Sequence, residues 1–223
     1  MTRAAYAEAF PAVTGRPLIK LPQMAGRTES EIFFDALASN GADVSATGAA
    51  EDLLEPFSDA LVAAMAARRD DLLTDGQLLP GATEALTAVA KLDGVVQTVL
   101  TGNSKPNAEL KLRTFGLDEH LDLRLGGYGS APFPRGTLVR VTREQAAGKY
   151  PEMLFTEQGT VYIADSPRDV DAARIGGARS LAVASGRSSA AELREAGADA
   201  VLPDLTDPAA LTELIVRLTQ TRH

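Results

Sequence analysis

The chain has no cysteine and no tryptophan, and its only histidines are His120 and His223. Without cysteine, disulfides, thiolate metal sites and cysteine nucleophiles are excluded. The two histidines lie far apart in the sequence, so neither a zinc site nor a Ser-His-Asp triad is well supported. Aromatic residues make up 5% of the chain, so we expect a core built mainly from alanine, leucine and valine.

The chain also lacks an excess of positive charge and any long apolar segment. It has 22 basic and 30 acidic residues, a net charge of -8, which disfavours nonspecific binding to nucleic acid or anionic lipid. No apolar run approaches the ~20 residues that a membrane span needs, and the N-terminus lacks the apolar segment of a secretory signal. We therefore expect a cytoplasmic protein, a monomer or a homodimer, that binds neither nucleic acid nor membrane.

The first third of the sequence predicts helices only. Thr28 with Glu31 has the form of a capping box, in which the two side chains satisfy each other's backbone N–H groups. No strand is expected before Leu79. The expected helices cover residues 5–13, 28–40 and 50–73.

From residue 80 onward, helices alternate with short apolar strands. This alternation predicts an α/β fold with a doubly wound, Rossmann-like parallel sheet covered on both faces. Ligands bind such sheets at the carboxyl ends of the strands, which here selects Thr101 and Asp165. The expected strands cover residues 95–102, 160–165, 180–185 and 198–202, with a short extended piece at 121–127. The expected helices cover residues 81–92, 105–117, 137–150, 166–177, 188–197 and 208–218.

Two carboxylates follow the strand that ends at Asp165. Ser166 and Pro167 begin a helix, and Asp169 lies in its first turn. Both carboxylates can therefore face the same strand-end crevice, and hard oxygen ligands with room for water and phosphate suit Mg²⁺. Either aspartate alone is explained as a helix cap. The pair, placed between an apolar strand and a helix, favours a metal site.

Thr101 is the companion residue at the other strand end. Gly102 and Asn103 follow it, and a helix begins directly after them. A threonine hydroxyl in this position can donate to a phosphate oxygen together with backbone N–H groups. The pattern alone is a weak signal, because such turns are also common entries to helices.

In this order, the segments resemble the haloacid dehalogenase (HAD) superfamily, in particular its phosphoglycolate phosphatase-like branch. The resemblance rests on LLPGATEAL, VLTGN, GGYGS and, most specifically, ADSPRDVDAARIGGARSLAVASG. The family's fourth motif commonly reads GD-small-Pro-x-Asp, and Ala164 stands here in place of its glycine. The resemblance implies a helical cap over residues 1–78 and a HAD-like α/β core over residues 79–223.

The resemblance also implies roles for individual residues. Thr101 would bind the transferring phosphoryl group, with Gly102 and Asn103 beside it, while Asp165 and Asp169 would hold Mg²⁺ or orient its waters. The third motif requires a basic residue. Arg135 ranks first for that role, ahead of three basic residues on the following helix, which fit a solvated face better: Arg140, Arg143 and Lys149.

The family's first motif is an apolar strand ending in DxD, usually DxDGT, and no such strand is found here. Its first aspartate attacks phosphorus, and its second serves as general acid and base. In the family fold this strand lies between those ending at Thr101 and Asp165. We expect that about 15 to 20 residues are lacking, which leaves backbone groups unpaired on both neighbouring strands.

Three explanations remain open for the lack of this motif. The start codon lies upstream of the assigned one, the chain is a pseudoenzyme that works by binding, or another residue acts as nucleophile. Nothing in the sequence nominates such a residue.

We therefore expect a Mg²⁺-dependent phosphomonoester hydrolase acting on a small phosphorylated metabolite, with phosphoglycolate as the substrate implied by resemblance. The chain as printed is expected to be inactive. The alternative is a noncatalytic binding or regulatory protein on the same scaffold; a dinucleotide-binding domain is disfavoured because no GxGxxG follows a strand. Arg27, in AGRTES, is placed either to reach a substrate anion or to be a surface charge beside the capping Thr28.

Overall fold

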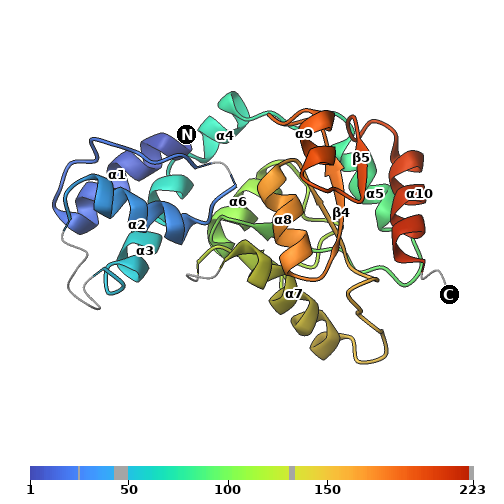
Figure 1. Ribbon diagram of the computed structural model, residues 1–223. Coiled ribbons are helices and arrows are strands. Elements are labelled where there is room, and N and C mark those ends of the chain that lie inside the picture. Colours follow the sequence, from blue (N-terminus) through green and yellow to red (C-terminus); the bar gives the residue numbers. More distant parts are fainter. Residues whose placement is uncertain (25, 43–49, 131–133, 221–223) are drawn as a thin grey trace. The chain divides into compact units, whose positions relative to one another are not determined.

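The computed structural model describes residues 1–24, 26–42, 50–130 and 134–220 (Figure 1). The chain divides into two compact units. The helical unit comprises Met1–Gln77, Thr101–Gly116 and Tyr128–Pro132, and the sheet unit comprises Leu78–Leu100, Leu117–Gly127 and Phe133–His223. No helix in the described part of the chain is long and apolar enough to cross a membrane.

The helical unit confirms the helices expected in the first third of the chain, with one difference. The helix predicted over residues 50–73 is interrupted at Ala67 and Arg68. The capping box is confirmed: Glu31 N donates to Thr28 Oγ1 at 3.2 Å, and Thr28 N donates to Glu31 Oε2 at 2.7 Å. The helices are α1 (Thr2–Thr14), α2 (Glu29–Ser39), α3 (Leu54–Ala66), α4 (Arg69–Asp75) and α6 (Lys105–Thr114).

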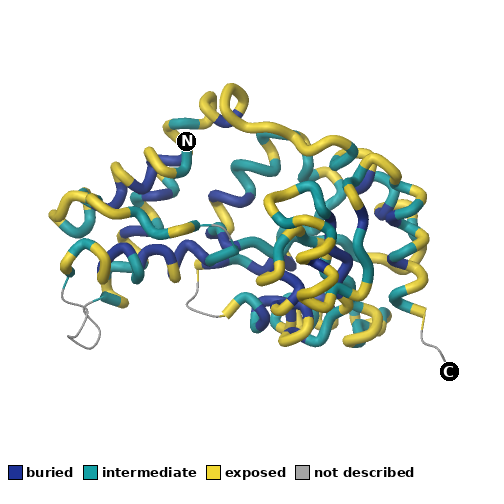
Figure 2. The backbone as a smooth tube through the Cα atoms, turned by 45° about the horizontal axis from the view of Figure 1, so that its top comes forward, coloured by how far each residue is buried: buried dark blue, intermediate teal, exposed yellow. Residues whose placement is uncertain are grey.

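The core of the helical unit is more aromatic than the composition predicts. Four aromatic rings from α1, α2 and α3 lie among its 12 buried residues. The rings of Phe33 and Phe57 stack with centroids 4.2 Å apart, and Tyr6 and Phe10 are fully buried beside them. Figure 2 colours the backbone of these helices by burial. Aromatic rings therefore contribute strongly to the packing of these helices, because one ring buries more apolar area than an alanine or valine does.

The sheet unit contains three parallel strands in the order β3-β4-β5. Alternate residues of a strand face opposite sides: Leu181 and Val183 of β4 pack against α5 and α10, and Ala182 packs against α8 and α9. Helices therefore cover both faces of this sheet, as the sequence predicts. The elements are α5 (Ala82–Val89), α7 (Arg135–Lys149), β3 (Val161–Ala164), α8 (Pro167–Ile175), β4 (Arg179–Val183), α9 (Ala190–Glu195), β5 (Ala200–Leu202) and α10 (Pro208–Thr219).

The strand predicted over residues 95–102 forms only in part. Its residues Leu100–Thr101 make the two-residue strand β1, which pairs with β2 (Gly127–Tyr128). Within the described ranges the strands form two separate sheets, and β3 is an edge strand on which Ile163 is 36% exposed. A strand persists only where its backbone groups find partners.

Asp122 connects three segments of the sheet unit. Its backbone N–H donates to Gln97 O at 2.8 Å. Its carboxylate forms an ion pair with Lys149 and accepts a hydrogen bond from Tyr150 Oη at 2.9 Å. Burial raises the pKa of Asp122, but the hydrogen bonds from Lys149, Tyr150 and Arg124 outweigh it and hold that pKa well below its usual range.

The substitution Asp122→Asn should lower the free energy of unfolding by about 1.5 kcal/mol at neutral pH, because hydrogen bonds to a charged carboxylate are lost. The folded pKa lies below the unfolded value of ~3.9, so the stabilisation is complete above that value and is lost as the pH falls through the folded pKa. In urea unfolding, the difference between the wild type and the variant should shrink below about pH 4. Asp93→Asn, at an exposed position, should have the same free energy of unfolding as the wild type at both pH values. A deficit that stays constant with pH would contradict this account.

Candidate active site

Asp169, in the first turn of α8, is buried and bonded by three side chains. Its Oδ1 accepts a hydrogen bond from Tyr162 Oη at 2.9 Å and pairs with Arg135 Nε at 3.0 Å. Its Oδ2 accepts from Ser166 Oγ at 2.6 Å, and the side chain is 4% exposed. A buried carboxylate requires such compensation, because burial otherwise disfavours its charge. These contacts hold Asp169 in place, and Asp169 in turn holds Arg135 by its Nε.

Asp165, at the end of β3, has the opposite environment. It is exposed, and within the described residues its carboxylate has no hydrogen-bond or ion-pair partner. The backbone of Gly186 lies against it, since a Cβ added at Gly186 would lie 2.1 Å from Asp165 Oδ2. Gly186 was not identified from the sequence. Asp165 is thus an uncompensated carboxylate with lone pairs available to a ligand.

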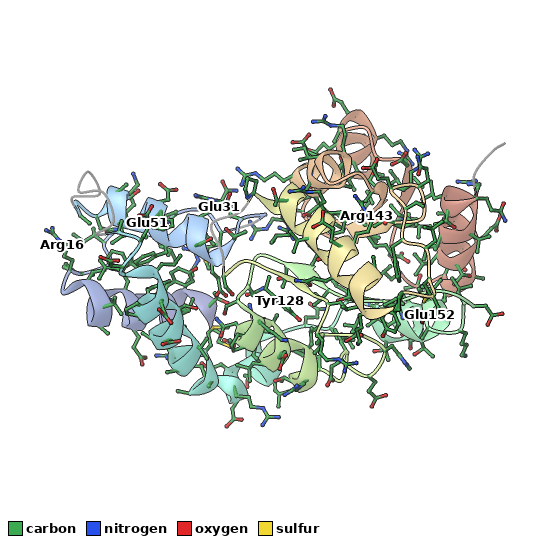
Figure 3. All side chains as sticks on the ribbon, turned by 90° about the horizontal axis from the view of Figure 1, so that it is seen from below. Arg16, Glu31, Glu51, Tyr128, Arg143 and Glu152 are labelled. Carbon is green, nitrogen blue, oxygen red and sulfur yellow. The ribbon has the colours of Figure 1, made fainter. Side chains whose placement is uncertain are left out.

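Arg135 is the basic residue that contacts the Asp169 carboxylate. Its Nε is used by Asp169 and by Tyr162 Oη, which lies 3.1 Å away, while its Nη atoms have no partner in the described part of the chain. Arg143 instead donates to the carbonyls of Gly176 and Gly177 (Figure 3). The other two basic residues on α7 are also paired elsewhere: Arg140 with Glu144, and Lys149 with Asp122.

Tyr162 links Arg135 to Asp169 and was not identified from the sequence, where it is one more large residue in an apolar strand. Burial raises the pKa of Tyr162 far above its usual range; Arg135 opposes this, and Asp169 adds to it. The hydroxyl therefore stays protonated at neutral pH and donates to Asp169. Its position between the two groups holds the guanidinium by Nε and leaves the other two nitrogens directed elsewhere.

In the helical unit, Thr101 is arranged as a hydrogen-bond donor. Its Oγ1 accepts from the backbone N of Asn103 at 3.2 Å and from Asn103 Nδ2 at 2.7 Å. Asn103 Oδ1 accepts from Lys111 Nζ at 2.6 Å, which fixes the orientation of the amide. Burial lowers the pKa of Lys111, although Glu29 opposes the change. Because the lone pairs of Thr101 are occupied, its own proton is available to an anion.

Gly102 brings the Thr101 turn into contact with the residues that precede α2. Gly102 O accepts from Glu29 N at 2.7 Å, and a Cβ at Gly102 would lie 2.0 Å from Arg27 O. Arg27 itself pairs with Asp35, with Nη1 2.7 Å from Oδ2, and donates from Nη2 to Glu31 O at 3.1 Å. The arginine predicted to reach a substrate anion is therefore engaged within its own unit.

The predicted site residues fall into two groups in different units. Arg27, Thr101, Gly102 and Asn103 lie in the helical unit, and Arg135, Asp165 and Asp169 lie in the sheet unit. In the helical unit, Thr101 contacts Asn103 and Gly102 contacts Arg27, and in the sheet unit Arg135 contacts Asp169. The convergence of Thr101 and Asp165 at one strand-end crevice stays a prediction.

The spacing DxD occurs once in the sequence, at Asp169-Val170-Asp171. It lies inside α8, where Asp171 is exposed and pairs with Arg174, so it is not a strand-end motif. Within the described ranges, no three histidine, cysteine or acidic side chains gather as a metal site.

Solved structures of HAD hydrolases share this fold. A HAD hydrolase of family IA, variant 3, from Entamoeba histolytica is 16% identical, with a TM-score of 0.58 over 96% of this chain and 92% of that one. A HAD family hydrolase from Deinococcus radiodurans, solved with bound phosphate and sodium, is 21% identical, with a TM-score of 0.51 over 96% of this chain and 89% of that one. A comparison with curated proteins returns no match.

The family model described as haloacid dehalogenase-like hydrolase matches residues 6–174, three quarters of the chain. The chain therefore belongs to the haloacid dehalogenase-like hydrolase family.

Proposed function

We propose that residues 1–223 form the phosphate- and metal-binding body of a Mg²⁺-dependent phosphomonoester hydrolase of the phosphoglycolate phosphatase-like branch. Residues 1–78 would form the cap over the substrate, and residues 79–223 the core. The observation that carries this proposal is the pairing of Arg135 with the buried Asp169, four residues after an Asp165 carboxylate that has no partner among the described residues. One fixed cation and one available anion at the junction of β3 and α8 suit a phosphate ester and its metal ion.

In this proposal each group has a separate task. The Nη atoms of Arg135 bind phosphoryl oxygens in the planar, two-pronged manner that guanidinium allows. Thr101 donates its hydroxyl proton to a further oxygen, and the N–H groups that begin α6 add to it. Both contacts become stronger as negative charge grows on the oxygens in the transition state.

The residues fit a magnesium ion held mainly by one carboxylate. Mg²⁺ usually takes one or two carboxylates, several waters and substrate phosphate. Asp165 is free for that purpose, whereas the oxygens of Asp169 already accept from Ser166, Tyr162 and Arg135. We therefore assign direct ligation to Asp165 and an indirect, charge-balancing role to Asp169. The ion would neutralise charge on the phosphoryl oxygens.

The substitution Asp165→Asn should weaken the binding of Mg²⁺ alone by at least about tenfold, measured by calorimetric titration. Asp171→Asn removes an equal charge at an exposed position two residues after Asp169, and it should leave the Mg²⁺ affinity unchanged. Equal losses in both variants would indicate a general effect of charge and would contradict the assignment to Asp165.

The alternative function is noncatalytic binding, and it is favoured by one observation. No apolar strand of the printed sequence ends in DxD, so no aspartate is identified that would attack phosphorus. Both functions predict that the protein binds phosphate, and only the first predicts that it hydrolyses a phosphate ester.

The test uses an aryl phosphate and inorganic phosphate with Mg²⁺. Residues 1–223 should bind inorganic phosphate and release no phenol. If the codons directly upstream encode a strand ending in DxDGT, the chain extended by them should hydrolyse the ester, and Asp→Asn at its first aspartate should abolish that activity. A stop codon directly upstream would support the binding function. Absence of phosphate binding would refute both.

A further inference from the structure

The helical unit contains a cleft of about 460 Å³ at the start of α2. It is lined by Arg27, Ser30, Glu31, Phe34 and Asp35. Exposed Glu31 is visible at this end of the helix in Figure 3. The cleft adjoins the Thr101 turn within the same unit, because the backbone N–H at the first residue of α2 donates to Gly102 O at 2.7 Å. A group attached to a phosphate at Thr101 would therefore enter it.

The charged side chains of the cleft leave it with a net negative charge. Among the described residues that line the cleft, Arg27 is the only cation, and both of its Nη atoms are already used by Asp35 and by Glu31 O. Glu31 contributes a second carboxylate; its Oε2 accepts from Thr28 N and Oγ1 at 2.7 and 3.1 Å. In the described residues, Glu31 Oε1 and Asp35 Oδ1 have no donor. The cleft thus offers free acceptors and no free cation.

The beginning of α2 does not reverse this balance. A helix N-terminus attracts anions through its unpaired N–H groups. Here Glu29 N donates to Gly102 O, Ser30 N donates to Gly129 O at 3.4 Å, and Glu31 N donates to Thr28 Oγ1 at 3.2 Å. The first donors of the helix are therefore occupied, and a carboxylate lies beside them.

We infer that this cleft selects phosphate esters whose leaving group carries N–H or O–H donors and no carboxylate, with Asp35 as the specificity-determining residue. The inference rests on the proposed phosphate site. Small amino-alcohol phosphates fit, since their ammonium group meets the free oxygens of Glu31 and Asp35, and Phe34 supplies an apolar wall. Phosphoglycolate, the substrate implied by resemblance, would place a carboxylate against two others, with Arg27 already paired.

The test compares the affinities of phosphoethanolamine and 2-phosphoglycolate by calorimetry, with inorganic phosphate as the reference that has no leaving group. For the wild type, phosphoethanolamine should bind about fivefold more tightly than phosphoglycolate, the size expected for exposed charge interactions. Asp35→Asn removes one negative charge and releases Arg27, so the preference should disappear or reverse. Asp59→Asn, an equal change of charge at an exposed position on α3, should retain the wild-type preference.

The outcomes separate this inference from the proposed function. Two results would overturn the inference and leave the phosphate site standing. In the first, the wild type binds phosphoglycolate as tightly as phosphoethanolamine. In the second, Asp35→Asn shows the same preference between the two ligands as the wild type. Failure of inorganic phosphate to bind overturns the proposed function and the inference with it.

Discussion

Replacing Arg135 by methionine should lower the free energy of unfolding by about 3 kcal/mol. The guanidinium is 19% exposed and its partner carboxylate on Asp169 is 4% exposed, so the substitution leaves a buried negative charge without its cation. Tyr162 and Ser166 still donate to Asp169, which keeps the loss at the lower end of the range for such pairs. Urea unfolding at neutral pH measures the change. The stabilisation that inorganic phosphate gives to the wild type should be lost as well.

Two matched variants separate the causes of this effect. Arg140→Met removes a cation from the same helix, but that side chain is 60% exposed and pairs weakly with Glu144, so stability should change little. Tyr162→Phe keeps both charges and removes the hydroxyl that donates to Asp169 and accepts from Arg135, which should cost about 1.5 kcal/mol. An Arg135→Met protein as stable as Arg140→Met would contradict a buried ion pair at Asp169.

Arg135 was ranked first from the sequence because the family resemblance requires a basic residue near the start of a helix; it contacts Asp169, and its role toward phosphate stays a prediction. Tyr162 and Gly186 were not. A tyrosine in an apolar strand usually indicates core packing, and its hydrogen bond to Asp169 depends on a helix turn seven residues later. Gly186 follows a different strand, and only folding brings its backbone against Asp165. The pairing of Arg27 with Asp35 likewise depends on how the chain enters α2.

The fold was predicted best where elements are defined by their own residues. The capping box of α2 and the covered sheet β3-β4-β5 follow from local pattern and from helix–strand alternation. The strand over residues 95–102 has equally good local pattern, yet only Leu100–Thr101 forms a strand. Whether a strand forms depends on its neighbours, because the backbone N–H and C=O groups of a strand form their hydrogen bonds with adjacent strands and not within the strand itself.

Gly102→Ala should lower the free energy of unfolding by about 3 kcal/mol, from overpacking and a lost hydrogen bond. Its Cβ would lie 2.0 Å from Arg27 O and 2.8 Å from Arg27 C, both backbone atoms that cannot rotate away. The segment that leads into α2 must then move, which breaks the Glu29 N–Gly102 O hydrogen bond. Because the same turn carries Thr101, the affinity for inorganic phosphate should fall together with stability.

Gly148→Ala is the matched control, and its effect should have the opposite sign. This glycine lies exposed in α7 with no atom within 4 Å of an added Cβ, so alanine should stabilise the helix by about 0.5 to 1 kcal/mol. Thermal and urea unfolding of both variants, with phosphate titrations on the folded proteins, measure the two effects. If Gly102→Ala were as stable as the wild type and bound phosphate normally, the contact between the Thr101 turn and the entry to α2 would not hold the phosphate site and the cleft together.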